Sequence, residues 1–325
     1  MPAYHLQNSA NRQGALSCQT LGWYHNTLFG GEQTADAALA FIRNCGFDGI
    51  DYHFEGVYTA TQIRNGAKSP VFDQTTEALQ VHYLPLKKAM AAQNIVITQA
   101  HGISPQYLPG NEEMNAYLHA VMVKSLEVCR FLNCPSLVLH PIRSLSQKEN
   151  ERLFQSLIPH ALENSVMICI ENMFLRAEDG NLPFFDAATA CQMIDNLNAA
   201  AGETVFGCCY DTGHANLTGR NIYEDICLLD DRLICLHIHE NDGIHDQHLI
   251  PYTQQQPFTK RSYVDWDSLC SALAQIAYKG PINFEVHPAL RVAPPALTED
   301  LLKLTSAVGR HLQKCIQSAK TTTAL

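Results

Sequence analysis

The stretch VMICIEN, at residues 166–172, is an apolar run that ends in a carboxylate and an amide. Val, Met, Ile and Cys follow one another without alternating with polar residues, which indicates a strand buried on both of its faces. Strands of this kind belong to parallel sheets that helices cover on both sides. The stretch therefore predicts a buried parallel strand with polar side chains at its C-terminal end.

The same pattern recurs along the chain and alternates with helical patterns. The predicted strands lie at 15–21, 49–54, 95–101, 136–141, 166–172, 205–211, 233–239 and 282–288. Amphipathic helical patterns lie at 34–45, 116–132, 148–162, 265–278 and 298–316. Eight strand–helix units in about 300 residues favour a closed barrel over an open doubly wound sheet, and no GxGxxG follows the first strand. We expect a single (β/α)₈ TIM-barrel domain over residues 1–325, with frayed ends at 1–14 and 318–325.

Composition narrows the class of protein. Of the 325 residues, 46% are hydrophobic and 17% are charged, which is enough apolar material for one large core. The formal charge of −10 argues against a nucleic-acid partner. No run of about 18 apolar residues predicts a membrane span, and the polar N-terminus does not read as a signal peptide. The twelve cysteines contain no CxxC, so we expect buried free thiols and a cytoplasmic protein.

Ionisable residues stand at the C-terminal ends of six predicted strands. They are His101, His140, Glu171, Asp211, His239 and Glu285. In a barrel these ends meet at the face that carries the active site, and carboxylates packed there require a cation. Mixed imidazole and carboxylate ligands suit Zn²⁺, Mn²⁺ or a similar ion better than Ca²⁺. We therefore expect a divalent metal (Mn, Zn, Co or Fe), held chiefly by the four residues Glu171, Asp211, His239 and Glu285.

A second group of ligand-type residues follows the sixth and seventh strands. His214 lies in the turn after Asp211, and Asp246 and His248 form a second plausible ligand set. His237 and His239 point to the same face of an extended strand, so their spacing cannot choose between them. We choose His239 as the ligand because it lies at the end of the predicted strand.

Taken together, the strand-end motifs of the chain resemble those of the xylose-isomerase-like barrel superfamily. The resemblance is carried by QAHG (99–102), VLHP (138–141), CIEN (169–172), DTGH (211–214), HIHEND (237–242), DQH (246–248), VDWDSL (264–269) and FEVHP (284–288). The superfamily includes sugar phosphate isomerases and epimerases, ketose 3-epimerases and type IV apurinic endonucleases. The ordered set of motifs is specific for the superfamily but not for one activity within it.

For the epimerases, the resemblance implies one metal held by Glu171, Asp211, His239 and Glu285. It also implies that Glu171 and Glu285 are the catalytic acid–base pair and that His214 contacts a substrate oxygen. The metal would stabilise an enediolate while one glutamate removes a proton and the other returns it. We favour this function: a metal-dependent isomerase or epimerase of a sugar, sugar phosphate or related polyol. Because both glutamates are present, a non-catalytic binding barrel is disfavoured.

For the type IV endonucleases, the resemblance implies up to three zinc ions and nine ligands. All nine have a counterpart here: His101, His140, Glu171, Asp211, His214, His239, Asp246, His248 and Glu285. A multi-metal phosphodiester hydrolase is therefore one alternative, and a polyol dehydratase is another. The net charge and the segment HLIPYTQQQPFTKRSYVDW (248–266), which lacks the Gly-Glu-Gly of both branches, argue against the hydrolase.

Residues that follow the early strands are candidates for contact with the substrate. Trp23 and His53 could line a sugar pocket, since aromatic faces pack against sugar C–H groups. Arg143, Arg176 and Arg220 follow the fourth, fifth and sixth strands and could meet a phosphate or carboxylate. The sequence leaves open which sugar is bound, whether it is phosphorylated and whether the chain forms a homo-oligomer.

Overall fold

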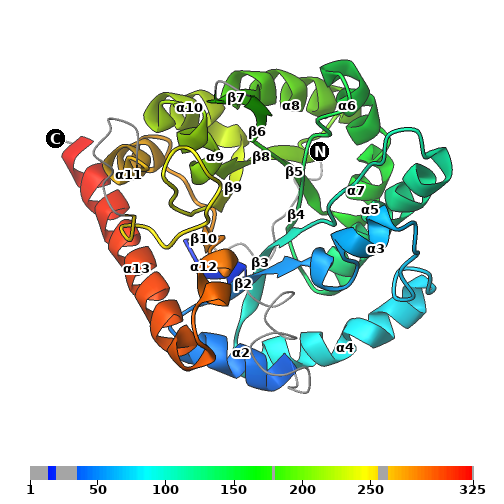
Figure 1. Cartoon of the computed structure of the whole chain (residues 1–325), viewed down its shortest axis with the longest axis horizontal. Coiled ribbons are helices and arrows are strands. Elements are labelled where there is room, and N and C mark those ends of the chain that lie inside the picture. The colour runs from blue at the N-terminus through cyan, green and yellow to red at the C-terminus, as the bar shows by residue number, and fades with distance from the viewer. Residues whose placement is uncertain (1–13, 20–34, 178–179, 255–262, 324–325) are drawn as a thin grey trace.

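The computed structural model describes residues 14–19, 35–177, 180–254 and 263–323. Eight parallel strands form one sheet, in the order β10-β1-β2-β3-β4-β5-β8-β9. They are β1 (Leu16–Gln19), β2 (Gly49–His53), β3 (Val96–His101), β4 (Ser136–Leu139), β5 (Met167–Glu171), β8 (Phe206–Asp211), β9 (Leu233–His237) and β10 (Ile282–Phe284). A parallel bridge between Ile238 and Phe284 joins the last two strands and closes the ring. The predicted (β/α)₈ barrel is confirmed (Figure 1).

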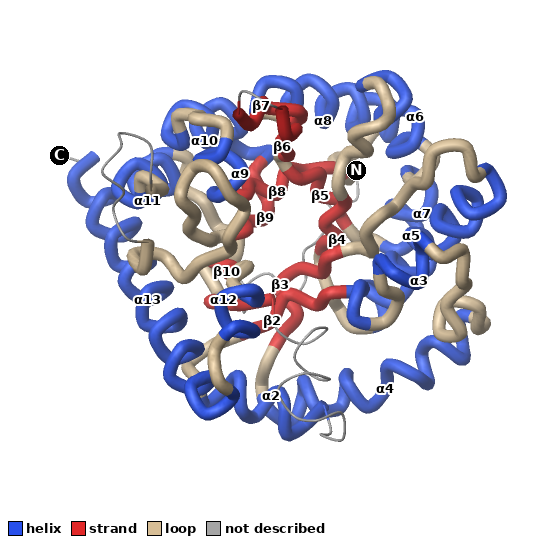
Figure 2. Tube along the Cα trace, viewed as in Figure 1, coloured by secondary structure: helices blue, strands red, loops and turns tan. Residues whose placement is uncertain are grey.

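Helices surround the strands on the outside of the ring (Figure 2). They are α2 (Ala35–Asn44), α3 (Ala60–Arg64), α4 (Thr76–Gln93), α5 (Glu112–Phe131), α6 (Gln147–Gln155), α7 (Ile158–Asn164), α8 (Ala187–Ala201), α9 (Thr212–Leu217), α10 (Ile222–Leu229), α11 (Trp266–Gln275), α12 (His287–Val292) and α13 (Thr298–Thr323), with short 3₁₀ turns at Phe54–Gly56, Asp230–Arg232 and Pro295–Leu297. The helix expected at 148–162 is divided into α6 and α7. The division precedes Pro159, which has no N–H to continue the ladder of a helix. Within the described residues, no helix is long and apolar enough to cross a membrane.

Several elements end at other residues than the apolar runs predict. Strand β9 ends at His237 rather than at 239, and β10 ends at Phe284 rather than at 288. Beyond these points Ile238 and Glu240 form only isolated bridges, with Phe284 and Leu249, and Pro288 stands in the first turn of α12. Helix α13 runs on to Thr323. It therefore covers most of the stretch 318–325 for which we expected a frayed end.

A hairpin that the sequence analysis did not predict stands between β5 and α8. Strands β6 (Met173–Ala177) and β7 (Gly180–Phe185) pair antiparallel and form a separate two-stranded sheet. The pair is short, and much of it is exposed. Pro183 lies in β7, as is usual for a strand at an edge. Because the hairpin begins two residues after Glu171, it stands on the C-terminal face of the barrel (Figure 1).

The inner wall of the barrel carries a layer of small side chains beneath its C-terminal face. Val138, Cys169, Cys209 and Cys235 form a buried cluster. The three cysteines lie two residues before Glu171, Asp211 and His237, so the alternation of the strand points each pair of side chains inward. Burial raises the pKa of the Cys169 and Cys209 thiols well above the ordinary value. This layer therefore provides an uncharged floor for the ionisable groups above it.

Candidate metal centre

Four ionisable side chains converge at the C-terminal ends of the strands. Glu171, Asp211, His237 and Glu285 each offer a ligand atom, and these atoms all lie within 4.8 Å of one another. All four side chains are buried. Glu171, Asp211 and His237 are the last residues of β5, β8 and β9, and Glu285 directly follows β10. The three carboxylates expected at one metal are therefore together in the structure.

Four of the histidines share one pattern of contacts. In His101, His214, His239 and His248, Nδ1 lies 2.8–3.5 Å from a backbone carbonyl oxygen, that of Gly102, Asn172, Glu240 and Glu285 respectively. A carbonyl oxygen only accepts hydrogen bonds, so Nδ1 carries the proton and the neutral ring keeps a lone pair on Nε2. Histidines that ligate metals are usually held in this way.

The Nε2 atoms of these rings face the acidic side chains. His239 Nε2 lies 3.0 Å from Asp211 Oδ2, and His248 Nε2 lies 3.3 Å from Asp246 Oδ1. His214 Nε2 lies 3.6 Å from Asp246 Oδ2. His239, Asp246 and His248 also form a ligand group of their own within 4.8 Å. The structure thus places the second predicted ligand set directly beside the first.

Glu171 is shared by a further pair of histidines. His140 Nε2 lies 3.1 Å from Glu171 Oε2, and His101 Nε2 lies 3.6 Å from the same oxygen. The two Nε2 atoms lie 3.0 Å from each other. Two ring nitrogens and a carboxylate oxygen that face one point form a donor set suited to a cation such as Zn²⁺. All nine candidate ligands therefore lie in one connected cluster.

His237 differs from the other histidines in what its ring contacts. Its Nδ1 lies 3.2 Å from Glu171 and 3.0 Å from Glu285, whereas Nε2 lies 3.3 Å from Asp51. Among the described residues, neither ring nitrogen makes a hydrogen bond of good geometry. The structure thus groups His237 with the first three carboxylates and His239 with Asp246 and His248. The choice of His239 as the ligand stays a prediction.

Asp51 forms the base of the cluster, a role that the sequence analysis did not identify. Its Oδ2 accepts hydrogen bonds from Gln99 Nε2 (3.0 Å) and Asn283 Nδ2 (2.9 Å). Ser17 in turn donates to Asn283 Oδ1 (2.8 Å). All of these side chains are fully buried. The polar residues inside β1, β2, β3 and β10 were the available signal, because a barrel interior is more often filled with branched apolar side chains.

The segment Asp211-Thr-Gly-His214 has a local fold that orients two candidate ligands. The Asp211 carboxylate caps α9 by accepting from the backbone N–H of His214 (2.6 Å). The side chain of Asn172 forms two hydrogen bonds with the backbone of Asp211. It donates to the carbonyl oxygen (3.0 Å) and accepts from the N–H (2.6 Å). A Cβ at Gly213 would lie 1.9 Å from Cε1 of His239. Glycine is therefore required there for the imidazole to approach.

The charges within the cluster are strongly coupled. Burial alone would raise the pKa of Glu171 and of Glu285, but the His237 ring beside both holds each pKa well below its usual range. Burial also opposes the charge on His101, yet Glu171 raises the pKa of that ring to about 9. The positive charge of protonated imidazoles thus offsets the negative charge of the carboxylates. A bound cation supplies the same balance and leaves the imidazoles free to act as ligands.

The residues expected to contact a substrate are placed differently. The His53 ring stacks on that of His101, with centroids 4.6 Å apart and the planes 7° from parallel. Arg220 is not brought into the cluster, because Asp225 and Asp186 bind its guanidinium. Trp23 lies outside the described residues. His287, which follows Glu285 in the same motif, joins that residue and His248 in a further ligand group.

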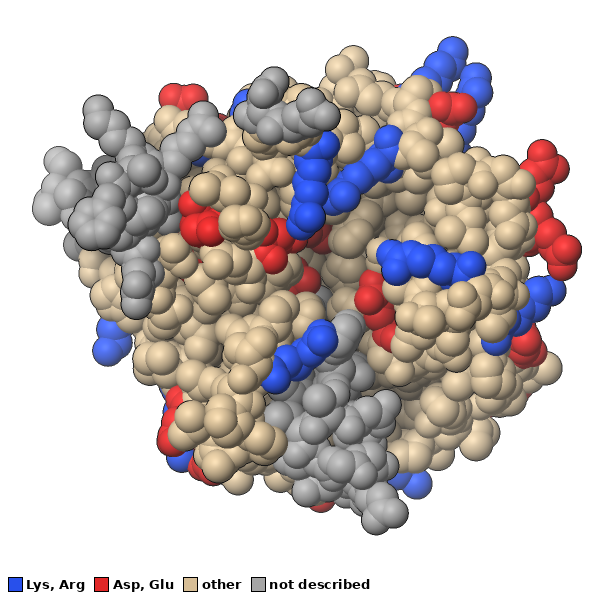
Figure 3. Space-filling view, in the orientation of Figure 1, with Lys and Arg blue, Asp and Glu red and all other residues tan. Residues whose placement is uncertain are grey.

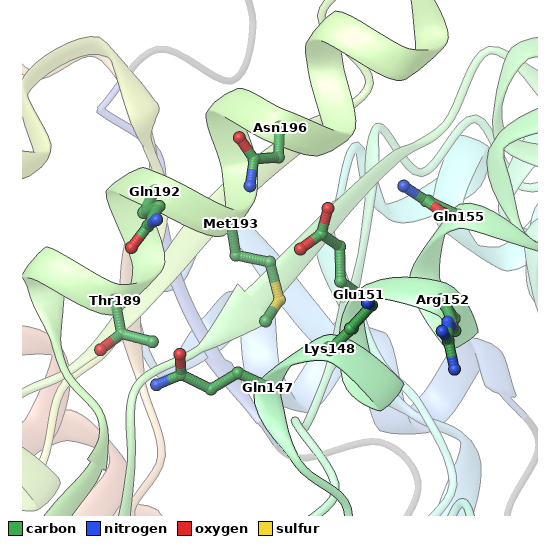
Figure 4. Close-up of a pocket in the computed structure, with 9 residues that line it drawn as sticks. All are labelled: Gln147, Lys148, Glu151, Arg152, Gln155, Thr189, Gln192, Met193 and Asn196. Atoms are coloured by element: carbon green, nitrogen blue, oxygen red, sulfur yellow. The ribbon is translucent and has the colours of Figure 1, made fainter.

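A separate groove of about 460 Å³ lies on the outer ring of helices. Polar side chains from α6 and α8 line it, including Gln147, Glu151, Gln192 and Asn196 (Figure 4). None of the predicted site residues lines this groove. The convergence of ionisable groups, rather than this cavity, identifies the candidate site.

Solved structures share the fold at low identity. A D-psicose 3-epimerase in the presence of D-fructose is 14% identical, with a TM-score of 0.64, over 91% of this chain and 99% of that one. A D-allulose 3-epimerase from Methylomonas sp. is 17% identical, with a TM-score of 0.64, over 93% and 98%. The 3-keto-D-glucoside 4-epimerase YcjR from E. coli is 14% identical, with a TM-score of 0.62, over 91% and 100%.

Sequence comparison identifies the family. An uncharacterized protein of Sinorhizobium fredii, y4fM, is 28% identical over 174 residues, and this match spans about half of each chain (49% of this one and 50% of the other). The family model described as xylose isomerase-like TIM barrel matches residues 39–307. The chain therefore belongs to the xylose isomerase-like TIM-barrel family.

Proposed function

We propose that this protein is a divalent-metal-dependent isomerase or epimerase of a sugar, sugar phosphate or related polyol. One observation carries the proposal. Glu171 and Glu285 come from strands that β8 and β9 separate, yet they offer oxygens within 4.8 Å of each other at the C-terminal face. Two carboxylates that reach one point from different sides of a barrel can serve opposite faces of one substrate carbon. The relatives named above as epimerases of D-psicose, D-allulose and a 3-keto-D-glucoside support this substrate class.

The proposed metal ligands are Glu171, Asp211, His239 and Glu285. The cluster fits a divalent cation because its carboxylates are buried and its Nε2 atoms are aimed at them, as described above. When bound, the cation would stabilise negative charge on the oxygens next to the carbon that loses its proton. His101, His140, His214, Asp246 and His248 surround this group and would bind any further ion.

Glu171 and Glu285 act as the proton acceptor and donor in this proposal. The pKa of each is held well below its usual range, after burial, by the charge of His237. Both carboxylates are therefore ionised before the substrate binds, so either can accept the first proton. The opposite glutamate must first take up a proton from solvent before it can return one to the other face of the carbon. His214 Nδ1 lies 3.3 Å from Glu171 Oε1, and this proximity supports a contact between its ring and a substrate oxygen.

The test is proton exchange at the carbon next to a ketose carbonyl. The Mn²⁺-loaded protein is incubated with D-fructose, D-psicose and their phosphates in deuterated water, and deuterium at C3 and C1 is followed by NMR. We expect incorporation with the wild type and none with Glu171→Gln or Glu285→Gln. Glu163→Gln, at an exposed position of α7, is the control. Equal incorporation by the wild type and both site variants would overturn the assignment of the two glutamates.

A second candidate is multi-metal hydrolysis of a phosphodiester. The observation that favours it is the separate ligand group of His239, Asp246 and His248 beside the first. Clustered metal ions can activate water and hold the leaving oxygen of a phosphodiester. One metal ion per chain and no cleavage of abasic duplex DNA would exclude this function. Loss of water from a cyclic polyol, detected in the same NMR experiment, would instead identify a dehydratase.

A further inference from the structure

Two arginines, Arg143 after β4 and Arg176 on the hairpin of β6 and β7, stand at the edge of the candidate metal centre. Phe174, in β6, lies against the His214 ring, with centroids 5.1 Å apart. The guanidinium of Arg143, which follows β4, lies over the ring of Phe174, at 5.1 Å from the ring centroid. Arg176 is two residues beyond Phe174 in the same strand, so it shares the face of the hairpin that carries Phe174. Arg143 thus stands one aromatic ring away from His214, and Arg176 lies close enough for its charge to act on Arg143.

These two arginines differ from others in how they are paired. Arg220 and Arg232 are bound by Asp225 and Asp195. In the described part of the chain, Arg143 and Arg176 form no ion pair with a carboxylate. Burial lowers the pKa of Arg143, the charges of Asp246 and Glu171 oppose this shift, and the charge of Arg176 adds to it. Arginines that no carboxylate binds at ion-pair distance are a feature of anion-binding sites.

The position of the arginines suits the end of a small substrate that lies away from its reacting carbon. The chain carries a formal charge of −10, yet Lys and Arg side chains stand at the edge of the hollow on the face shown in Figure 3. Phe174 packs against the flat guanidinium of Arg143, and among the described residues no carboxylate lies at ion-pair distance from it. A planar fork of N–H donors matches the oxygens of a phosphate or carboxylate.

We propose that Arg143 and Arg176 bind an anionic group of the substrate, a phosphate or a carboxylate, while its reacting carbon lies at Glu171 and Glu285. The role of this group as part of the substrate rests on the proposed function. The anion site itself is independent of catalysis, because none of the predicted metal ligands belongs to it. Its failure and the failure of the proposed function can therefore be distinguished.

The test is calorimetric titration of the metal-free protein, first with inorganic phosphate and then with acetate, at low ionic strength to limit screening. We expect one saturable site for at least one of the two anions. Arg143→Gln and Arg176→Gln should each weaken that binding about tenfold or more, because each removes charged hydrogen bonds. Arg152→Gln, an exposed arginine of α6, is the matched control and should bind as the wild type does.

Each outcome bears on the proposal. Binding of phosphate that both variants lose identifies a phosphate site, and the same result with acetate alone identifies a carboxylate site. Absence of binding in the metal-free wild type, or equal binding by wild type and variants, overturns the proposal. Binding that occurs only after Mn²⁺ is added, and that the arginine variants retain, means that the anion contacts the metal and also overturns it. Thermal melting of each variant checks that the fold is intact.

Discussion

His237 Nε2 lies 3.3 Å from Asp51 Oδ2, and both side chains are completely buried. The opposite nitrogen of the ring lies between the carboxylates of Glu171 and Glu285. Gln99 and Asn283 fix the carboxylate of Asp51 from two other strands. One buried imidazole therefore links a rigid base in β2, β3 and β10 to both proposed acid–base residues.

This relationship predicts that Asp51 positions the two glutamates through His237. Asp51→Asn keeps the shape but removes the charge that holds the ring, so the carboxylates above it lose their alignment. We expect proton exchange by the Mn²⁺-loaded enzyme to fall about 10–100-fold, the usual effect of losing an outer-shell partner. The measurement is the rate of deuterium incorporation, with Mn²⁺ affinity measured in parallel.

Thr98→Val is the matched control for this change. Thr98 is also buried, and its single hydroxyl proton can go to Ser17 Oγ or to the carbonyl oxygen of Ile50. Among the described residues it has no hydrogen bond to Asp51. Thr98→Val should lower the free energy of unfolding but leave the rate of deuterium incorporation unchanged. If Asp51→Asn exchanged deuterium at the wild-type rate, the positioning role would be wrong.

Gly213 gives a second prediction, on the role of His239. A Cβ at this position would lie 1.9 Å from the His239 ring, so Gly213→Ala must displace the imidazole. We expect the Mn²⁺ affinity to fall about tenfold or more, because His239 is a proposed ligand. Overpacking should also cost about 1–3 kcal/mol of unfolding free energy. Calorimetric Mn²⁺ titration and urea unfolding measure the two effects.

Ala215→Gly separates lost stability from lost ligation. Ala215 is buried in the same helix, and glycine there costs about 1 kcal/mol through helix propensity. This variant should bind Mn²⁺ as the wild type does. Wild-type affinity in Gly213→Ala would instead show that His239 is not a ligand, and would direct attention to His237.

The recurring apolar runs predicted which carboxylates meet at the metal centre. They could not predict which of two histidines on the same strand face is the ligand. Glu171 and Asp211 end apolar runs, and a parallel barrel necessarily gathers such ends at one face. His237 and His239 lie two residues apart, so the period of a strand gives both the same direction. What separates them is the contact of the second ring nitrogen, which is Asp51 for one and a backbone carbonyl for the other. Such contacts arise only when distant strands meet.

Asp51 and the β6–β7 hairpin were missed for related physical reasons. Asp51 lies inside β2 rather than at its end, and the register of β2 against β3 shifts between Ile50 and Asp51. A shift of this kind depends on the neighbouring strand and leaves no mark in GIDYHF (49–54). The hairpin is short and largely exposed, so it lacks the apolar run by which the eight barrel strands were found.

Removal of the metal should destabilise the fold. A cation that binds only the native state raises the free energy of unfolding. The increase is about 2.7 kcal/mol when the free metal concentration is 100 times its dissociation constant. We expect chelation to lower the melting temperature and Mn²⁺ or Zn²⁺ to restore it. The double variant Glu171→Gln/Glu285→Gln should no longer respond to added metal. A melting temperature that neither chelator nor metal changes in the wild type would contradict the proposed centre.

Alkaline pH should destabilise the protein through buried thiols outside the metal centre. Burial raises the pKa of Cys45 from its ordinary value of 9.0 to about 11, and that of Cys270 to about 12. The folded state therefore keeps these protons after the unfolded state has released them, so stability falls as pH rises from 9 through 11. Urea unfolding at pH 8, 9, 10 and 11 measures the decline, which should be shallower in Cys45→Ala. Cys227→Ala, at a half-buried position of α10, is the control, and an equal slope in all three proteins would show that Cys45 does not contribute.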